Sequence, residues 1–201
     1  MCGFVGAWSL GYDPTAGQDL DGDGLSDLLL DNYNDFGDAG VFAVLGDPAF
    51  VSTTVAASDR WFVADPAEPN VEMCVPGDVD GDGYLDLGVV AEETLYLLLG
   101  PPTTGLTTAD AYASSTALAI DCHDGADTNG DGVDELLFES MSTLYRFGLP
   151  LSSGAFSGAE GQITFPDELA GVTAADVTGD GADDVMVGVG AMFYLFAGGE
   201  W

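Results

Sequence analysis

Short apolar runs recur along the whole chain and are separated by polar segments rich in Asp and Gly. The runs are three to five residues long and rich in Val, Leu and aromatic residues, which predicts β-strands. Eight strong runs form four pairs: Leu28–Leu30 with Val41–Leu45, Leu87–Val90 with Leu95–Leu99, Leu136–Phe138 with Leu144–Phe147, and Val185–Val189 with Phe193–Phe196.

Weaker strand candidates lie between one pair of runs and the next. Examples are Arg60–Ala64 followed by Val71–Val75, and Gln162–Phe165 followed by Gly171–Ala175. Each repeating unit is therefore predicted to contain four strands.

A nine-residue acidic loop precedes each pair of runs, and the four loops align on one pattern. They begin at Asp19, Asp78, Asp127 and Asp176, so their starts lie 59, 49 and 49 residues apart. Four-stranded units with a period of about 50 residues are typical of propellers. The predicted fold is therefore all-β, a β-propeller-like array of four four-stranded blades.

The array is predicted to form a single domain over residues 1–201, with repeats at about 11–64, 71–118, 119–166 and 171–201. The last repeat lacks an outer strand. By its offset from the first loop, segment 3–10 is one candidate to complete that blade and close the array. The alternative, an excised piece of a longer propeller, is equally open.

The loops carry candidate metal ligands at fixed positions. Positions 1, 3, 5 and 9 offer side-chain oxygens, and position 7 is expected to offer its backbone carbonyl. This all-oxygen set suits a hard cation, and Gly at positions 4 and 6 permits a tight turn. The predicted ligands are Asp19, Asp21, Asp23, Leu25 and Asp27; Asp78, Asp80, Asp82, Tyr84 and Asp86; Asp127, Asn129, Asp131, Val133 and Glu135; and Asp176, Thr178, Asp180, Ala182 and Asp184.

Calcium is the expected ion, with up to four ions per chain. Many oxygen ligands on a flexible loop favour calcium over magnesium, and zinc would require His or Cys. An EF-hand would need Glu at position 12, where each loop has an apolar residue. A solvated Asp/Gly turn explains one loop but not four copies with the same spacing. Because Thr178 replaces a carboxylate, the fourth site is expected to be the weakest.

The loops and the apolar strand after each of them resemble the FG-GAP repeats of integrin α-subunit propellers and their bacterial relatives. The resemblance spans all four units, although the Phe-Gly and Gly-Ala-Pro signatures of the family are largely absent. It implies that each loop joins the first and second strands of a blade and binds calcium through the residues named above.

The charge balance excludes several classes of partner. The chain has 35 acidic residues against 2 arginines and no lysine, for a formal charge of −33. Such a surface cannot follow a phosphate backbone, so nucleic acid and anionic membranes are not expected partners. The longest weakly polar stretch, Val185–Gly199, is too short and too rich in Gly for a membrane span.

Three cysteines, Cys2, Cys74 and Cys122, permit at most one internal disulfide, and Cys74–Cys122 is one of the possible pairs. A nucleophilic pair of Cys122 and His123 is disfavoured because neighbours in a strand point to opposite faces. The chain is therefore not expected to be an enzyme.

The leading expectation is an extracellular or cell-surface calcium-binding module for adhesion, ligand binding or envelope structure, with calcium as a structural ion. A protein or glycan ligand would be its partner, and self-association through a sheet edge or a donated strand is also considered. The alternatives are a self-assembling subunit of an extracellular fibre or layer, and a scaffold domain of a polysaccharide-active enzyme. No signal peptide is present in the sequence to fix the compartment.

Overall fold

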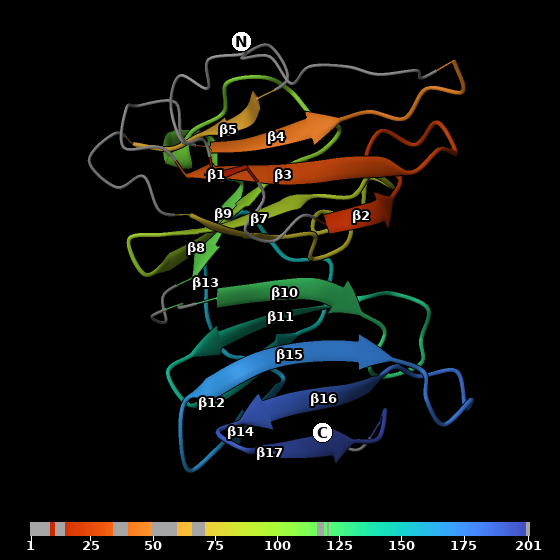
Figure 1. Ribbon diagram of the computed structural model, residues 1–201, viewed down its shortest axis with the longest axis vertical. Helices are drawn as coiled ribbons and strands as arrows, with labels where there is room; N and C mark the ends of the chain where they lie inside the picture. The colour runs from red at the N-terminus through yellow and green to blue at the C-terminus, as the bar shows by residue number, and fades with distance from the viewer. Residues whose placement is uncertain are drawn as a thin grey trace, which may run out of the picture.

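A computed structural model describes residues 9–10, 15–33, 40–49, 60–65, 71–115, 119 and 121–199. Its strands form four sheets that follow one another in chain order, from the first sheet at one end of the molecule to the fourth at the other (Figure 1). The all-β prediction is confirmed. In the described part of the chain, no helix is long and apolar enough to cross a membrane.

Each sheet is built mainly from neighbouring antiparallel strands. The first contains β1 (Ser9–Leu10), β2 (Thr15–Gln18), β3 (Asp27–Tyr33), β4 (Gly40–Val44) and β5 (Arg60–Val63). The second contains β6 (Glu72–Cys74), β7 (Leu87–Ala91), β8 (Thr94–Leu98) and β9 (Ala113–Ser115), with β13 (Gly154–Phe156) added in parallel to β9. The third contains β10 (Asp121–Ala126), β11 (Glu135–Ser140), β12 (Thr143–Phe147) and β14 (Gly161–Thr164). The fourth contains β15 (Leu169–Ala175), β16 (Asp184–Val189) and β17 (Met192–Phe196).

The strands that the apolar runs predicted are all present, each at or close to its expected position. The fourth sheet has three described strands, so the expected lack of an outer strand in segment 171–201 is also observed. Ser9 and Leu10, from the segment considered for completing that sheet, pair instead with Tyr33 and Asn32 of β3 in the first sheet. The remainder of that segment, residues 3–8, lies outside the described residues.

Hydrophobic cores lie between consecutive sheets. We call the side of a sheet that packs on the following sheet its front face, and the opposite side its rear face. Leu29 and Val41 of the first sheet pack against Leu87 and Val89 of the second. Two further cores join the second sheet to the third and the third to the fourth. Among the described residues, no strand pairing and no core cluster joins the fourth sheet back to the first.

The strands that precede the acidic loops, β2, β6, β10 and β15, nevertheless lie around a common space. We call them the first strands of their sheets and count the later strands from them. Gln18 of β2, Met73 of β6, His123 of β10 and Val172 of β15 line one cavity of about 380 Å³. This convergence of first strands is the arrangement expected around a propeller axis. The described sheets are thus stacked in chain order with their first strands beside this cavity, and a closed ring is not observed among the described residues.

A disulfide joins the second and third sheets through their first strands. Cys74 on β6 is bonded to Cys122 on β10, which settles the pairing that the sequence left open. Gly88 on β7 makes room for this bridge, because a Cβ atom there would collide with Cys74 Sγ. The bridge connects two strands whose cysteines are separated by 48 residues.

Candidate metal centres

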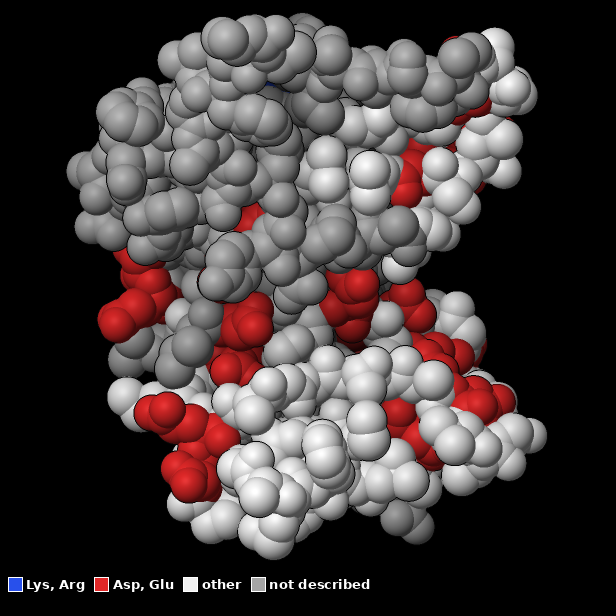
Figure 2. Space-filling view, in the orientation of Figure 1, with Lys and Arg blue, Asp and Glu red and all other residues white. Residues whose placement is uncertain are grey.

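The four acidic loops connect the first strand of each sheet to its second strand, as the resemblance implied. They cover residues 19–27, 78–86, 127–135 and 176–184. They therefore lie at the same end of every sheet, to the right in Figure 1, and acidic side chains gather there on the surface (Figure 2). The twenty predicted ligands are all among the described residues.

The carboxylate at position 1 organises the turn of each loop. Asp78 Oδ1 accepts hydrogen bonds from the N–H groups of Gly81 at 2.7 Å and Asp82 at 3.0 Å, and Oδ2 accepts one from Gly83 at 2.8 Å. Asp19, Asp127 and Asp176 accept bonds from the corresponding glycines of their loops. Gly81 and Gly83 have φ values of 82° and 94°, which other residues rarely adopt, so the turn requires glycine there.

Positions 3 and 5 each accept a hydrogen bond from the N–H group two residues ahead. In the second loop, Asp80 accepts one from Asp82 at 3.1 Å, and Asp82 accepts one from Tyr84 at 2.9 Å. The first and third loops repeat both bonds, and the fourth loop repeats the one at position 5. These Asx-type bonds curl the backbone locally and fix the carboxylates. The N–H of position 7 is used in this way, and its carbonyl stays a predicted ligand.

The carboxylate at position 9 is buried and ties the loop to its sheet. Asp86 Oδ2 accepts a hydrogen bond from Val79 N–H at 2.6 Å, and Oδ1 accepts one from Gly100 N–H, also at 2.6 Å. Asp27 makes the matching bonds to Leu20 and Gly46. Because Gly46 and Gly100 follow the third strands of their sheets, position 9 connects three parts of each of these two units.

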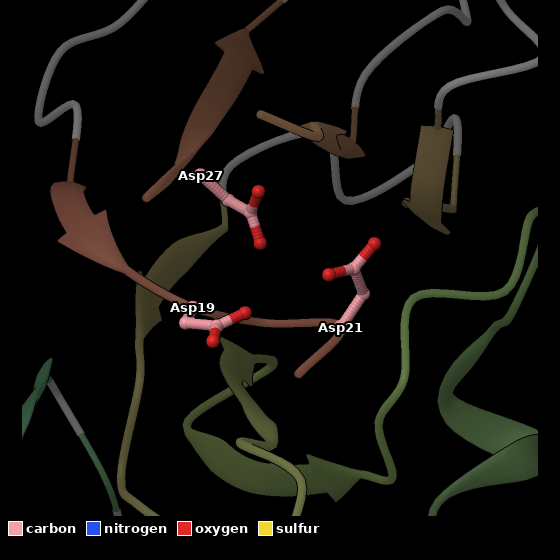
Figure 3. A group of neighbouring side chains, drawn as sticks. All are labelled: Asp19, Asp21 and Asp27. Atoms are coloured by element: carbon pink, nitrogen blue, oxygen red, sulfur yellow. The ribbon is translucent and has the colours of Figure 1, made fainter. Parts of the chain in front are cut away.

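Three carboxylates converge in each of the first two loops. Oxygens of Asp19, Asp21 and Asp27 all lie within 4.8 Å of one another, and so do those of Asp78, Asp80 and Asp86. Figure 3 shows the side chains of Asp19, Asp21 and Asp27 directed toward a common space inside the first loop. A set of hard, anionic oxygens at this separation has the chemistry that calcium prefers.

The third loop reaches a similar arrangement with different residues. Oxygens of Asp127, Asp131 and Glu135 lie within 4.8 Å of one another. Glu135 accepts hydrogen bonds from the Thr128 N–H at 2.9 Å, the Thr128 hydroxyl at 2.5 Å and the Asn129 amide at 2.5 Å. The Thr128 N–H is the same position-2 donor that Asp27 and Asp86 bond in their loops, and the longer Glu side chain also reaches the Thr128 hydroxyl and the Asn129 amide.

The fourth loop differs from the others at position 3, where the hydroxyl of Thr178 hydrogen-bonds Asp184. Asp184 also accepts bonds from the N–H groups of Val177, Thr178 and Gly198. Although all of this loop is described, it brings no three carboxylates within the distance found in the other loops. This geometry agrees with the expectation of a weaker fourth site, which stays a prediction.

Carboxyl pKa values reflect the close packing of these groups. The pKa of Asp86 is raised to about 6, mainly by burial and further by the charges of Asp80 and Asp78. Two backbone hydrogen bonds to Asp86 lower its pKa but do not cancel this rise. Burial likewise raises the pKa of Glu135. Hydrogen bonds, first that from Gly198, lower the pKa of Asp184. A cation inside the second or third loop would therefore relieve an electrostatic cost of ionising buried carboxyls.

Asp183, at position 8 of the fourth loop, joins this loop to the third loop, a role that the sequence analysis missed. Asp183 Oδ2 accepts a hydrogen bond from Asp127 N–H at 3.1 Å, and Asp183 N–H donates to the Asp127 carbonyl at 2.7 Å. Burial, and then the charges of Asp183 and Asp127, raise the pKa of Asp134. The only sequence signal is that acidic pairs occupy positions 8 and 9 in these two loops alone.

The cysteine and histidine that were considered for catalysis are placed differently from a nucleophilic pair. Cys122 is bonded to Cys74, so it has no thiol to activate. His123 Nε2 lies 3.5 Å from Glu139 Oε2 beside the cavity at the first strands. A Cys122–His123 nucleophile is therefore absent.

The fold and the loops together define a class, an all-β repeat protein with one acidic loop between the first two strands of each sheet. Residues 78–138 match the family model of the FG-GAP-like repeat, from the start of the second loop into β11. This segment is thus an FG-GAP-like repeat, and the resemblance seen in the sequence is confirmed. No curated protein matches the chain.

Proposed function

We propose that this chain is a calcium-binding, propeller-type module in which structural calcium ions, one per acidic loop and up to four in all, stabilise the stack of sheets. The observation that carries the proposal is the convergence of three carboxylates within 4.8 Å in each of three loops. Two like charges about 4 Å apart repel by about 4 kcal/mol at an effective dielectric near 20. A bound cation offsets this repulsion.

The ligands in each loop would come from the side chains of positions 1, 3, 5 and 9 and from the carbonyl of position 7. The backbone hydrogen bonds at positions 1, 5 and 9 hold the carboxylates in place before an ion binds. Ion binding therefore costs little side-chain entropy. Calcium is favoured over magnesium because the donors are numerous and lie on a turn, whereas magnesium requires a nearly ideal octahedral arrangement of ligands. Extracellular modules bind calcium at roughly 10⁻⁴–10⁻³ M, which is the range expected here.

Isothermal titration calorimetry and thermal unfolding test the proposal. Calcium should raise the melting temperature and a chelator should lower it, with each site adding about 1.4 kcal/mol at a calcium concentration tenfold above its Kd. Asp80→Asn should weaken the second site, whereas Glu168→Gln, which removes one exposed charge outside the loops, should leave binding unchanged. An absence of any shift across millimolar calcium would contradict the proposal.

We further propose that the module works outside the cell or at the cell surface, in adhesion, ligand binding or envelope structure. The disulfide between Cys74 and Cys122 supports an oxidising compartment, because such bonds persist in secreted proteins and are rare in the cytosol. Millimolar calcium in that compartment would fill the loops.

We propose a binding role rather than a catalytic one, with a protein or glycan as ligand. A glycan array and a turnover assay on polysaccharides separate these two classes. Binding without turnover is the expected result. Polysaccharide turnover that survives mutation of the ligands in all four loops would contradict the proposed binding role.

A further inference from the structure

The front faces of the first three sheets use the same positions to pack on the next sheet. One of these is position 2 of the loop, occupied by Leu20, Val79 and Thr128, all of which are buried. Another is the second residue of the third strand, where Val41, Leu95 and Leu144 are fully buried. Each set belongs to a unit whose front face is covered by the following sheet.

The fourth sheet presents apolar side chains at these same positions without a covering sheet. Val177 at position 2 of its loop is 71% exposed, and Phe193, the second residue of β17, is 76% exposed. Leu195 and Met186 of the same face are 60% and 40% exposed. Figure 2 shows a broad uncharged surface at the end of the molecule where Figure 1 places β15, β16 and β17.

The rear face of the first sheet has the pattern that the other sheets use to pack backwards. Its positions are occupied by Leu28, Leu30, Phe42 and Val44, which correspond through the strand register to Leu87, Val89, Tyr96 and Leu98 of the second sheet. Phe42 is already buried within the chain, with the guanidinium carbon of Arg60 5.4 Å from its ring centroid, and the other three are half-buried. Those four residues of the second sheet all belong to, or pack against, the first inter-sheet core. A groove of about 530 Å³ opens on this side of the first sheet and is lined by Leu25, Leu28, Val44 and Leu45, among others.

We propose that the front face of the fourth sheet is a docking surface for the rear face of the first sheet of a second copy of this chain. The contact would continue the internal stacking by one more step of the same kind, head to tail. This inference concerns self-association and goes beyond the proposed calcium function.

Contacts between consecutive loops also favour a second copy of this chain as the partner of the fourth sheet. In two of the three pairs of consecutive loops, position 7 of one loop packs on the glycine at position 4 of the preceding loop, as Tyr84 does on Gly22 and Ala182 on Gly130, whereas Gly81 contacts Pro150. Gly179, at position 4 of the fourth loop, faces open space, and Leu25 is the position-7 residue that a second copy would bring there. The side chains compared on the two surfaces are uncharged, although Asp27 and Asp47 also line the groove of the first sheet and Arg60 lies over Phe42. Association of the first and fourth sheets therefore places no acidic side chain of these sets against another.

Sedimentation velocity in calcium and moderate salt, from micromolar to millimolar protein, tests the proposal. The wild type should form dimers or larger species as concentration rises. The front variant, Phe193→Thr with Leu195→Thr, keeps residues suited to strands and should stay monomeric. The rear variant, Leu28→Thr with Leu45→Thr, should also stay monomeric, and an equimolar mixture of the two should form a one-to-one dimer. Met141→Gln changes an apolar residue that is 61% exposed in the β11–β12 turn, and it should associate like the wild type.

Three results would overturn the proposal. A wild type that stays monomeric over this range would show that the face is meant for another occupant. A rear variant that still dimerises would show that two fourth sheets pack on each other. A mixture that stays monomeric, while circular dichroism and melting curves show both variants folded, would exclude the head-to-tail contact.

Discussion

At the scale of single residues, the carboxylate at position 9 carries the most information about the loops. The nine-residue spacing is enough to predict Asp86 as a ligand. The spacing does not reveal that Asp86 also accepts a hydrogen bond from Gly100, because these residues are 14 apart and meet only after β7 and β8 pair. Burial from this pairing, which the local sequence does not contain, is also the main cause of the raised Asp86 pKa.

Asp86 should make the calcium-free protein more stable at pH 5 than at pH 7. Its pKa in the folded state, about 6, lies above the ordinary value of 3.8, so its contribution to stability is complete below about pH 4 and is lost as pH rises through 6. The effect should be on the order of 1–2 kcal/mol in the free energy of unfolding, measured with urea. Asp134 and Glu135 shift in the same direction.

The variant Asp86→Asn isolates this contribution, because it removes the titrating group and keeps the shape of the side chain. Its unfolding free energy should depend less on pH between 5 and 7 than that of the wild type. Asp184, whose pKa is lowered, should act only at more acidic pH. An identical pH dependence in the variant and the wild type would refute the assignment to Asp86.

At the scale of elements, the apolar runs predict the strands well because each is short, bounded by turns and rich in strand-forming residues. The repeated pattern also predicts where the acidic loop lies within each unit, directly before the second strand. The addition of β13 to the second sheet could not be predicted, because Gly154–Phe156 has no distinct pattern and pairs with β9 of another repeat. The Cys74–Cys122 bond was one of several possible pairs, since only the stacking of β6 on β10 brings these two side chains together.

Thr178→Asp should strengthen the fourth metal site, because it restores the carboxylate found at position 3 of the first two loops. We expect the calcium affinity of this site to rise roughly tenfold, equivalent to about 1.4 kcal/mol. Calorimetric titration measures the change. Thr103→Asp adds the same charge at an exposed position outside the loops and should have little effect. Equal gains in the two variants would mean that overall charge, not the loop, sets the affinity.

Replacing both Cys74 and Cys122 by Ala should lower the free energy of unfolding by about 2–4 kcal/mol, because the unfolded chain gains freedom. Urea denaturation measures the loss. Each single variant, Cys74→Ala or Cys122→Ala, should lose a similar amount, because either substitution breaks the bond. A double variant as stable as the wild type would indicate that the second and third sheets are held by their apolar core alone.

At the scale of the whole molecule, each core joins one sheet to the next, so stability is expected to be close to a sum of neighbouring contacts. The repeat in the sequence predicts this linear organisation. It does not predict whether the sheets close into a ring, because closure depends on small rotations between sheets that no residue pattern encodes.

The formal charge of the whole molecule would fall in magnitude from −33 to −25 with four calcium ions bound, since −33 + 8 = −25.

The disulfide between Cys74 and Cys122 also determines how the molecule would respond to mechanical tension between its ends. A pulling force can separate the outer sheets, but the covalent bond transmits the load past the chain between the two cysteines, a separation of 48 residues. In single-molecule pulling, a reducing agent should therefore lengthen the fully extended chain by about 160–170 Å, at roughly 3.3–3.6 Å per residue. An equal length with and without reductant would show that the bond does not carry the load. Under tension, a chain with this bond would keep its centre short while its ends extend.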